Sequence, residues 1–217
     1  MDQKIAYKPS LNFNAWARYY QYSNNPKYLS PYATFLNLSY YLQIAELGFE
    51  KRIGRASFIF KPYYYSEANT YNTTGTVYPQ NLSSKRLNLA TNYLSANHQL
   101  LSFTVEAGFS ESNNILYQHF FSWKFSSTYQ YKHFAVNAYF QNGPFYAPEL
   151  NVLAATGRKY ELYTIGPSYN GLLFNKRLLL NVTNYITYDN SYNKITNNMI
   201  LRGSYKLRRD MSFEFSY

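Results

Sequence analysis

The stretch ITNNMILRGSYKLRRDMSFEFSY, residues 195–217, alternates between two kinds of side chain. Its odd positions, from Ile195 to Tyr217, are almost all apolar or aromatic, and its even positions are almost all polar. A period of two places successive side chains on opposite faces of a β-strand. The stretch is therefore predicted to form a long strand with one apolar and one polar face, which ends on an aromatic residue.

The same alternation recurs along the chain and predicts an all-β protein. Apolar and polar positions alternate in residues 99–109, 115–131, 133–141 and 178–188, as they do in the last stretch. Half-apolar strands of an antiparallel sheet have this pattern. Ten strands are predicted, at residues 11–21, 32–50, 55–65, 86–95, 99–109, 115–130, 133–141, 160–174, 177–188 and 195–217.

Two regions leave the strand number open between eight and twelve. Near Ala45 and Glu46 the apolar positions change parity, which a β-bulge or an extra turn would explain. Residues 208–210 can form a three-residue hairpin, because Leu207 and Met211 would still share a face. Ten strands is the central prediction.

The connections between the predicted strands alternate in length. Short ones fall near residues 51–54, 96–98, 131–132 and 175–176. Long polar ones, rich in turn-forming residues, fall near residues 22–31, 66–85, 110–114, 142–159 and 189–194. No internal repeat or linker divides the sequence, so a single domain over residues 1–217 is predicted.

The composition is rich in aromatic residues without being hydrophobic overall. The chain has 27 Tyr and 16 Phe, a mean hydropathy of -0.46, and no apolar run near the roughly 18 residues of a spanning helix. The absence of Cys excludes disulfides and thiolate metal sites. A net charge of +10 points to nucleic acid, anionic lipid or an anion-lined interior. Nucleic-acid binding is the least favoured, because it does not explain sustained alternation.

The apolar face has the composition of a membrane-facing surface. Its aromatic residues lie toward strand ends with Leu, Val and Ala between them, and Tyr and Trp prefer the boundary between membrane and water. A lipid-embedded barrel also needs short turns at one end and long loops at the other. A soluble antiparallel β protein with an apolar core remains the alternative. The predicted membrane-interface aromatics are Tyr117, Phe121, Trp123, Phe125, Tyr129 and Tyr131.

The last strand resembles that of outer-membrane β-barrel proteins of Gram-negative bacteria. Met211, Phe213, Phe215 and Tyr217 form an alternating apolar stretch that ends in a terminal aromatic residue. The resemblance implies that this stretch is the C-terminal signal read by the barrel-assembly machinery. It also implies a transmembrane antiparallel up-and-down β-barrel in the bacterial outer membrane, whose signal peptide, absent from this chain, has been removed. The Tyr-, Asn- and Lys-rich composition is similar to that of Bacteroidota proteins.

Charged residues on the polar parity are predicted to face the lumen. They form either a salt-bridged plug or, if the lumen is open, a passage that favours anions. The expected function is thus a small pore or a structural or adaptor barrel. The alternative is an accessory subunit of a larger outer-membrane assembly for secretion, barrel biogenesis or nutrient uptake. The predicted lumen residues are Arg18, Arg55, Lys61, Arg86, Lys124, Arg202, Lys206, Arg208, Glu106, Glu161 and Glu214.

No catalytic or metal site is indicated. His98, His119 and His133 lack the spacing of metal ligands on a strand face. No acid–base pair is convincingly placed within hydrogen-bond reach, so the protein is not expected to be an enzyme and no cofactor is expected. The expected partners are the lipid bilayer, the barrel-assembly machinery during biogenesis, and other outer-membrane or periplasmic proteins. Basic residues near the short turns fit contact with anionic headgroups.

Overall fold

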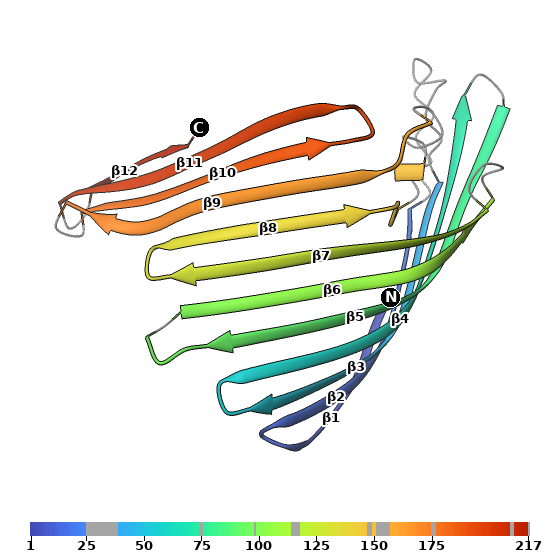
Figure 1. Cartoon of the computed structure of the whole chain (residues 1–217), viewed down its shortest axis with the longest axis horizontal. Coiled ribbons are helices and arrows are strands. Elements are labelled where there is room, and N and C mark those ends of the chain that lie inside the picture. The colour runs from blue at the N-terminus through green and yellow to red at the C-terminus, as the bar shows by residue number, and fades with distance from the viewer. Residues whose placement is uncertain are drawn as a thin grey trace.

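The computed structural model describes residues 1–24, 39–73, 76–97, 99–113, 118–146, 149–150, 157–174, 177–208 and 211–216. Within these residues, twelve strands form one antiparallel sheet in which each strand pairs with its neighbours in sequence (Figure 1). The predicted all-β class and up-and-down order are confirmed. The strands are β1 (Asp2–Ser10), β2 (Phe13–Asn24), β3 (Ser39–Ile53), β4 (Ala56–Thr73), β5 (Thr76–Leu94), β6 (Gln99–Ser112), β7 (His119–Tyr131), β8 (Phe134–Asn142), β9 (Glu161–Leu173), β10 (Leu178–Asp189), β11 (Lys194–Arg208) and β12 (Met211–Ser216).

The two strands beyond the predicted ten lie at the ends of the sheet. β1 forms from residues that no prediction covered, and it pairs with β2 through partners such as Ile5 and Ala17. At the other end, the stretch predicted as one strand is two, because β11 and β12 pair antiparallel with Arg208 opposite Met211. This pairing agrees with the strand break that the sequence allowed at residues 208–210, although residues 209 and 210 lie outside the described residues.

The polar segment 66–85 was predicted to be a loop, and most of it is strand. β4 and β5 continue through it as a long hairpin whose last pair is Thr73 and Thr76. The hydrogen bonds between strands are made by backbone groups, so polar residues can form strands as well as turns where neither face of the sheet must be apolar. The hairpin projects beyond the rest of the sheet in Figure 1.

Neither the β-bulge nor the extra turn that could explain the parity change near Ala45 and Glu46 is present in the described β3. β3 pairs without a register shift with β2, from Lys51 to Tyr40, and its pairing with β4 keeps one register. The apolar parity changes because Leu42 and Ile44 pack on the other side of the sheet, against a small cluster that includes Tyr65. A local apolar contact, and not an extra residue, explains the sequence pattern.

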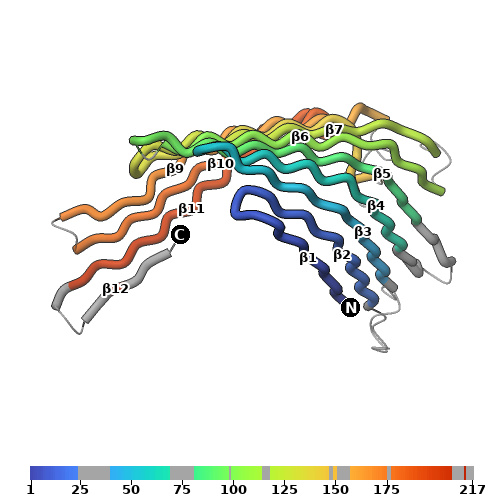
Figure 2. The backbone as a smooth tube through the Cα atoms, turned by 90° about the horizontal axis from the view of Figure 1, so that it is seen from below, coloured from blue at the N-terminus to red at the C-terminus, as the bar shows by residue number. Residues whose placement is uncertain are grey.

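The sheet is strongly curved but not closed. Figure 2 shows an arch with β1 at one free edge and β12 at the other. In the part of the chain that the structure describes, no pairing joins these two edges. Within the described residues the sheet is therefore open and curved, and β1 and β12 each keep one unpaired edge.

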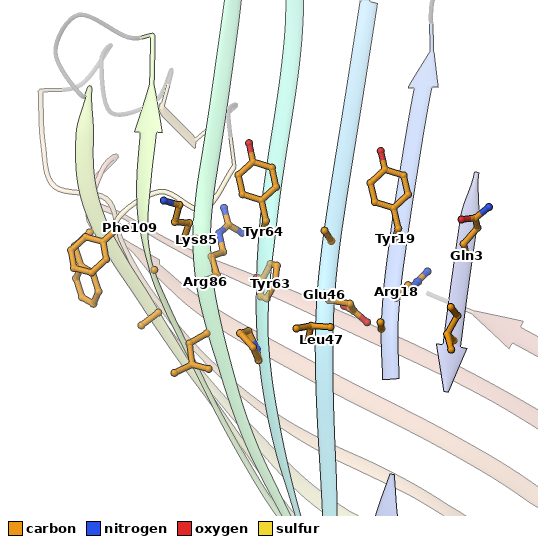
Figure 3. Close-up of a pocket in the computed structure, with 18 residues that line it drawn as sticks. Gln3, Arg18, Tyr19, Glu46, Leu47, Tyr63, Tyr64, Lys85, Arg86 and Phe109 are labelled. Carbon is orange, nitrogen blue, oxygen red and sulfur yellow. The ribbon is translucent and has the colours of Figure 1, made fainter. Parts of the chain in front are cut away.

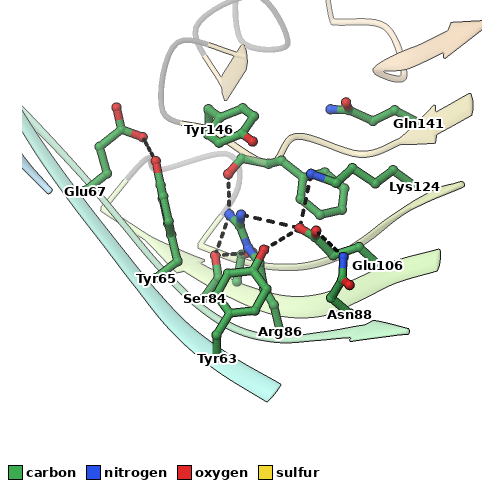
Figure 4. A network of polar contacts seen from close by, with 12 residues as sticks. Tyr63, Tyr65, Glu67, Ser84, Arg86, Asn88, Glu106, Lys124, Gln141 and Tyr146 are labelled. Carbon is green, nitrogen blue, oxygen red and sulfur yellow. Dashed lines mark hydrogen bonds and ion pairs between the residues drawn. The ribbon is translucent and has the colours of Figure 1, made fainter. Parts of the chain in front are cut away.

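Register carries side-chain direction from strand to strand and defines two faces. Directly paired residues of an antiparallel sheet lie on the same face. One set, which we call the inner face, includes Arg86, Glu106 and Lys124, and the sheet curves around it (Figure 4). The opposite set, the outer face, includes Phe109 and Phe121, which are paired and exposed.

The two faces reverse the usual distribution of polarity. Among the described residues, the buried hydrophobic side chains are only Tyr65, Leu82, Phe145 and Leu150. The buried polar ones, by contrast, are Glu67, Ser84, Arg86, Glu106, Ser110, Ser122, Gln141 and Ser191. Large apolar residues such as Phe60, Leu89, Val105 and Ile165 are exposed on the outer face. The described part of the chain contains no helix with the length and hydropathy of a membrane span.

Candidate functional site: a plugged polar inner face

A network of charged and polar groups occupies the inner face of β4 to β7. Glu106 lies at its centre: Oε1 accepts a hydrogen bond from the Tyr63 hydroxyl and lies 3.1 Å from Lys124 Nζ and 3.9 Å from Arg86 Nη1 (Figure 4). Its other oxygen accepts a hydrogen bond of 3.1 Å from Asn88 Nδ2. The Arg86 and Glu106 side chains are only 1% and 8% exposed, so both charges are removed from water.

The strand register brings these groups together. Asn88, Glu106 and Lys124 are direct partners across β5, β6 and β7, which makes them neighbours on one face. Arg86 lies two residues from Asn88, opposite Gly108. A Cβ at Gly108 would lie 2.7 Å from Arg86 Cγ, so the glycine leaves the space in which the arginine stem lies.

Part of the connection between β8 and β9 folds back onto this network. We call residues 143–146 and 149–150 the inward segment. The Phe145 carbonyl accepts a hydrogen bond from Arg86 Nη2, and Lys124 Nζ lies 4.3 Å from the centroid of the fully buried Phe145 ring. Leu150, also fully buried, joins Tyr65 and Leu82 in the small apolar cluster. The segment therefore covers the two cations with an aromatic ring and a carbonyl.

Glu149 fastens the inward segment to itself and to β8. Its Oε2 accepts hydrogen bonds from the Phe145 amide (2.6 Å), the Tyr146 amide (3.3 Å) and Gln141 Nε2 (2.8 Å). Burial raises the pKa of Glu149 above its ordinary value, and these donated bonds only partly oppose the rise. Burial, together with the neighbouring Glu149 charge, also raises the pKa of Tyr160.

Five of the predicted lumen residues lie on the inner face in ion pairs. Arg86, Lys124 and Glu106 form the central group. Lys61 Nζ lies 3.6 Å from Glu46, and Arg18 Nη2 lies 2.7 Å from Asp2. The row formed by Arg18, Glu46, Tyr63 and Arg86 links these pairs across β2 to β5.

The other predicted lumen residues do not all lie on the inner face. Arg202 and Lys206 lie on the inner face of β11, and neither forms an ion pair or a side-chain hydrogen bond within the described residues. The predictions for two others are wrong: Arg55 lies in the turn between β3 and β4, and Glu161 lies on the outer face, because it pairs with Asn142 in the row of Trp123. The side chains of Arg208 and Glu214 lie outside the described part of the structure.

The predicted interface aromatics that are described share one face of β7. Phe121, Trp123, Phe125, Tyr129 and Tyr131 point outward, and Tyr117 lies outside the described residues. Their rings contact rings of adjacent strands: Phe121 lies 5.1 Å from Phe109, and Trp123 lies 4.7 Å from Phe140, centroid to centroid. Phe140 continues the series to Tyr163 at 4.7 Å.

The C-terminal motif is only partly described. Phe213 is exposed on β12, opposite Tyr205. Tyr217 and the side chains of Met211 and Phe215 lie outside the described residues. The structure therefore places the motif on the edge strand of the sheet.

A cavity of about 630 Å³ adjoins the network on the inner face. Its lining includes two carboxylates that sequence reasoning missed, Glu46 and Glu67. The sequence did not assign Glu46 to a face, because the apolar pattern changes parity at this residue. Asp2, the partner of Arg18, lies in β1, which was not predicted. Glu149 belongs to a long connection, where strand parity carries no information.

The arrangement is chemically self-contained. Its two cations, Arg86 and Lys124, share the carboxylate of Glu106 and are covered by the inward segment, so they hold structure together more than they offer charge to a solute. Compared with known proteins, the chain matches no protein-family model and no curated protein sequence.

Proposed function

We propose that this protein is an integral outer-membrane β-barrel with a plugged interior, which acts as a structural or adaptor barrel and not as an open pore. The reversed polarity of the two faces carries the proposal. Apolar side chains cover the outer face while charged ones are buried on the inner face. In water this arrangement leaves large apolar areas solvated, whereas in a bilayer those areas contact hydrocarbon.

The outer face has a polar boundary that supports membrane insertion. One row across β2 to β7 is entirely polar and consists of Gln21, Gln43, Ser66, Ser83, Glu111 and His119. The next row toward the short turns is mainly aromatic and consists of Tyr19, Ala45, Tyr64, Lys85, Phe109 and Phe121. We call this second set the boundary row. Tyrosines and a lysine at the edge of an apolar surface are typical of the membrane interface.

The apolar band that begins at the boundary row has the width of a bilayer core. On β7 it runs from Phe121 to Tyr131. These ten residue steps span about 33 Å along a strand. At the strand tilt of about 40° that is usual in membrane barrels, this corresponds to about 25 Å across the membrane, the height of a typical apolar band.

Membrane insertion also requires a partner for the free edges of β1 and β12. Unpaired backbone amides are costly in hydrocarbon, so barrels close completely. In an up-and-down sheet of twelve strands the first and last strands are antiparallel, and the proposal includes their pairing within the bilayer. The same free edges favour the second candidate, an accessory subunit whose edges pair with strands of a larger assembly.

The proposal predicts that the reconstituted protein conducts no steady current. In planar bilayers the wild-type protein should stay silent, because the inward segment covers Arg86 and Lys124. A Phe145→Ala, Glu149→Ala double variant removes the buried ring and the carboxylate that fasten the segment. This variant should show steady steps that favour anions, because the inner-face cations are then exposed to the lumen.

A matched control comes from Tyr192, an exposed residue of the β10–β11 connection. Tyr192→Ala should stay as silent as the wild type. Steady anion-selective steps from the wild-type protein would instead support the open pore, to which Arg202 and Lys206 of the inner face would contribute. Silence from both wild type and double variant would show that the inward segment is not the barrier.

A further inference from the structure

The outer face is hollowed next to its boundary row. A groove of about 870 Å³ extends over β1 to β7, and Figure 3 shows the residues that line it. Small side chains of Ala17, Ala45 and Ala107 line it beside Leu47 and Leu87. The volume lies within the range of about 300–1,000 Å³ that is typical of small-molecule sites.

One cation that lines this groove, Lys85, is without a partner among the residues that the structure describes. Lys85 belongs to the boundary row, directly between Tyr64 and Phe109, and its side chain is exposed. It forms no hydrogen bond or ion pair within the described residues. Among the described strand positions of the outer face, the other lysine is Lys51, near the short turns. The nearest acid of this face, Glu111, lies one row farther on the polar side.

We propose that this groove binds one anionic phospholipid. The inference rests on the proposed membrane insertion and adds a specific lipid site to it. The phosphate would lie against Lys85 at the level of the polar boundary, with the Tyr64 hydroxyl beside it. An acyl chain would run toward the short turns over Ala17, Leu47, Leu87 and Ala107.

Two physical features select this occupant. Lys85 provides a single positive charge at the depth where headgroup phosphates lie, and opposite charges attract more strongly beside a low-dielectric medium than in water. The small side chains leave a hollow in which methylene groups of the lipid gain contacts that a flat face does not provide. A zwitterionic lipid would fill the hollow equally well but would gain less from Lys85.

The site can be tested by counting bound lipids. The protein is reconstituted in vesicles with equal amounts of phosphatidylglycerol and phosphatidylcholine, floated with them, and extracted gently for native mass spectrometry. The wild type should retain phosphatidylglycerol preferentially. Lys85→Gln should lower this preference about fivefold, while Lys85→Arg should keep it. Lys132→Gln, which removes a lysine from the turn beside Tyr131 and outside the groove, is the matched control and should lower the preference less than Lys85→Gln does.

The outcomes separate this site from membrane insertion itself. If the wild type does not float with the vesicles, both the proposed function and the lipid site are wrong. If it floats but shows no preference, or if Lys85→Gln has no larger effect than Lys132→Gln, only the lipid site is wrong. Displacement of the bound lipid by soluble glycerol 3-phosphate would also contradict it, because the groove would then bind phosphate without an acyl chain.

Discussion

Glu106→Gln is expected to destabilise the folded protein by about 3–5 kcal/mol, the usual cost of removing one partner from a buried ion pair. Gln keeps the size of the side chain but has one acceptor oxygen in place of two, so it can accept a hydrogen bond from Tyr63 or from Asn88 but not from both, and the change removes the charge together with one acceptor. Arg86 and Lys124 would then lie next to each other in a buried site with no carboxylate between them. The free energy of unfolding in lipid vesicles, obtained from urea titration, measures this effect.

A second ion pair provides the control. Glu50 lies 2.8 Å from Arg52, but that arginine is largely exposed. Glu50→Gln should cost no more than about 1 kcal/mol, because solvent screens exposed pairs. Adding Lys124→Met to Glu106→Gln should recover part of the loss. Equal costs for Glu50→Gln and Glu106→Gln would mean that the network is solvated and does not hold the inner face together.

Gly48→Ala is expected to have the second large effect, a loss of about 1–3 kcal/mol through overpacking. A Cβ at Gly48 would lie 2.0 Å from Cε2 of Trp16, which packs across the glycine on the inner face. The indole would have to move, and its hydrogen bond of 3.2 Å to Glu46 would be lost. Thermal or urea unfolding of the reconstituted protein measures the change.

The cause of this effect can be isolated with a second substitution. In a Trp16→Ala background the clash is absent, so Gly48→Ala should then cost little. The difference between the two backgrounds gives the coupling energy of the pair. The same cost in both backgrounds would show that the backbone at residue 48, and not the indole, requires glycine.

The alternation of the sequence was sufficient to predict most of the sheet, because a period of two is a local signal. It located the central residues of β6 to β11 and the outward direction of Trp123 and Phe121. It missed β1, where only Ile5 and Tyr7 carry the apolar pattern. It also misread β3, because Leu42 and Ile44 pack on the inner face against residues distant in sequence.

The site was less predictable than the fold, since it depends on contacts between distant segments. Parity placed Arg86, Lys124 and Glu106 on one face, but it could not pair them. The inward segment could not be foreseen, because Phe145 contacts Arg86 across 59 positions of sequence. Arg55 was misplaced because turn residues have no strand parity, and Glu161 because the register at the start of β9 is set by Asn142.

The chain's two tryptophans allow a direct test of whether hydrocarbon covers the outer face, because Trp16 lies on the inner face and Trp123 on the outer face. Fluorescence would be measured in vesicles of lipids brominated along their acyl chains, which quench indoles that they contact. The Trp16→Phe variant, which keeps only Trp123, should lose most of its emission, while Trp123→Phe, which keeps only Trp16, should retain most of it. Equal emission from both variants in brominated and ordinary lipid would contradict contact between the outer face and the membrane interior.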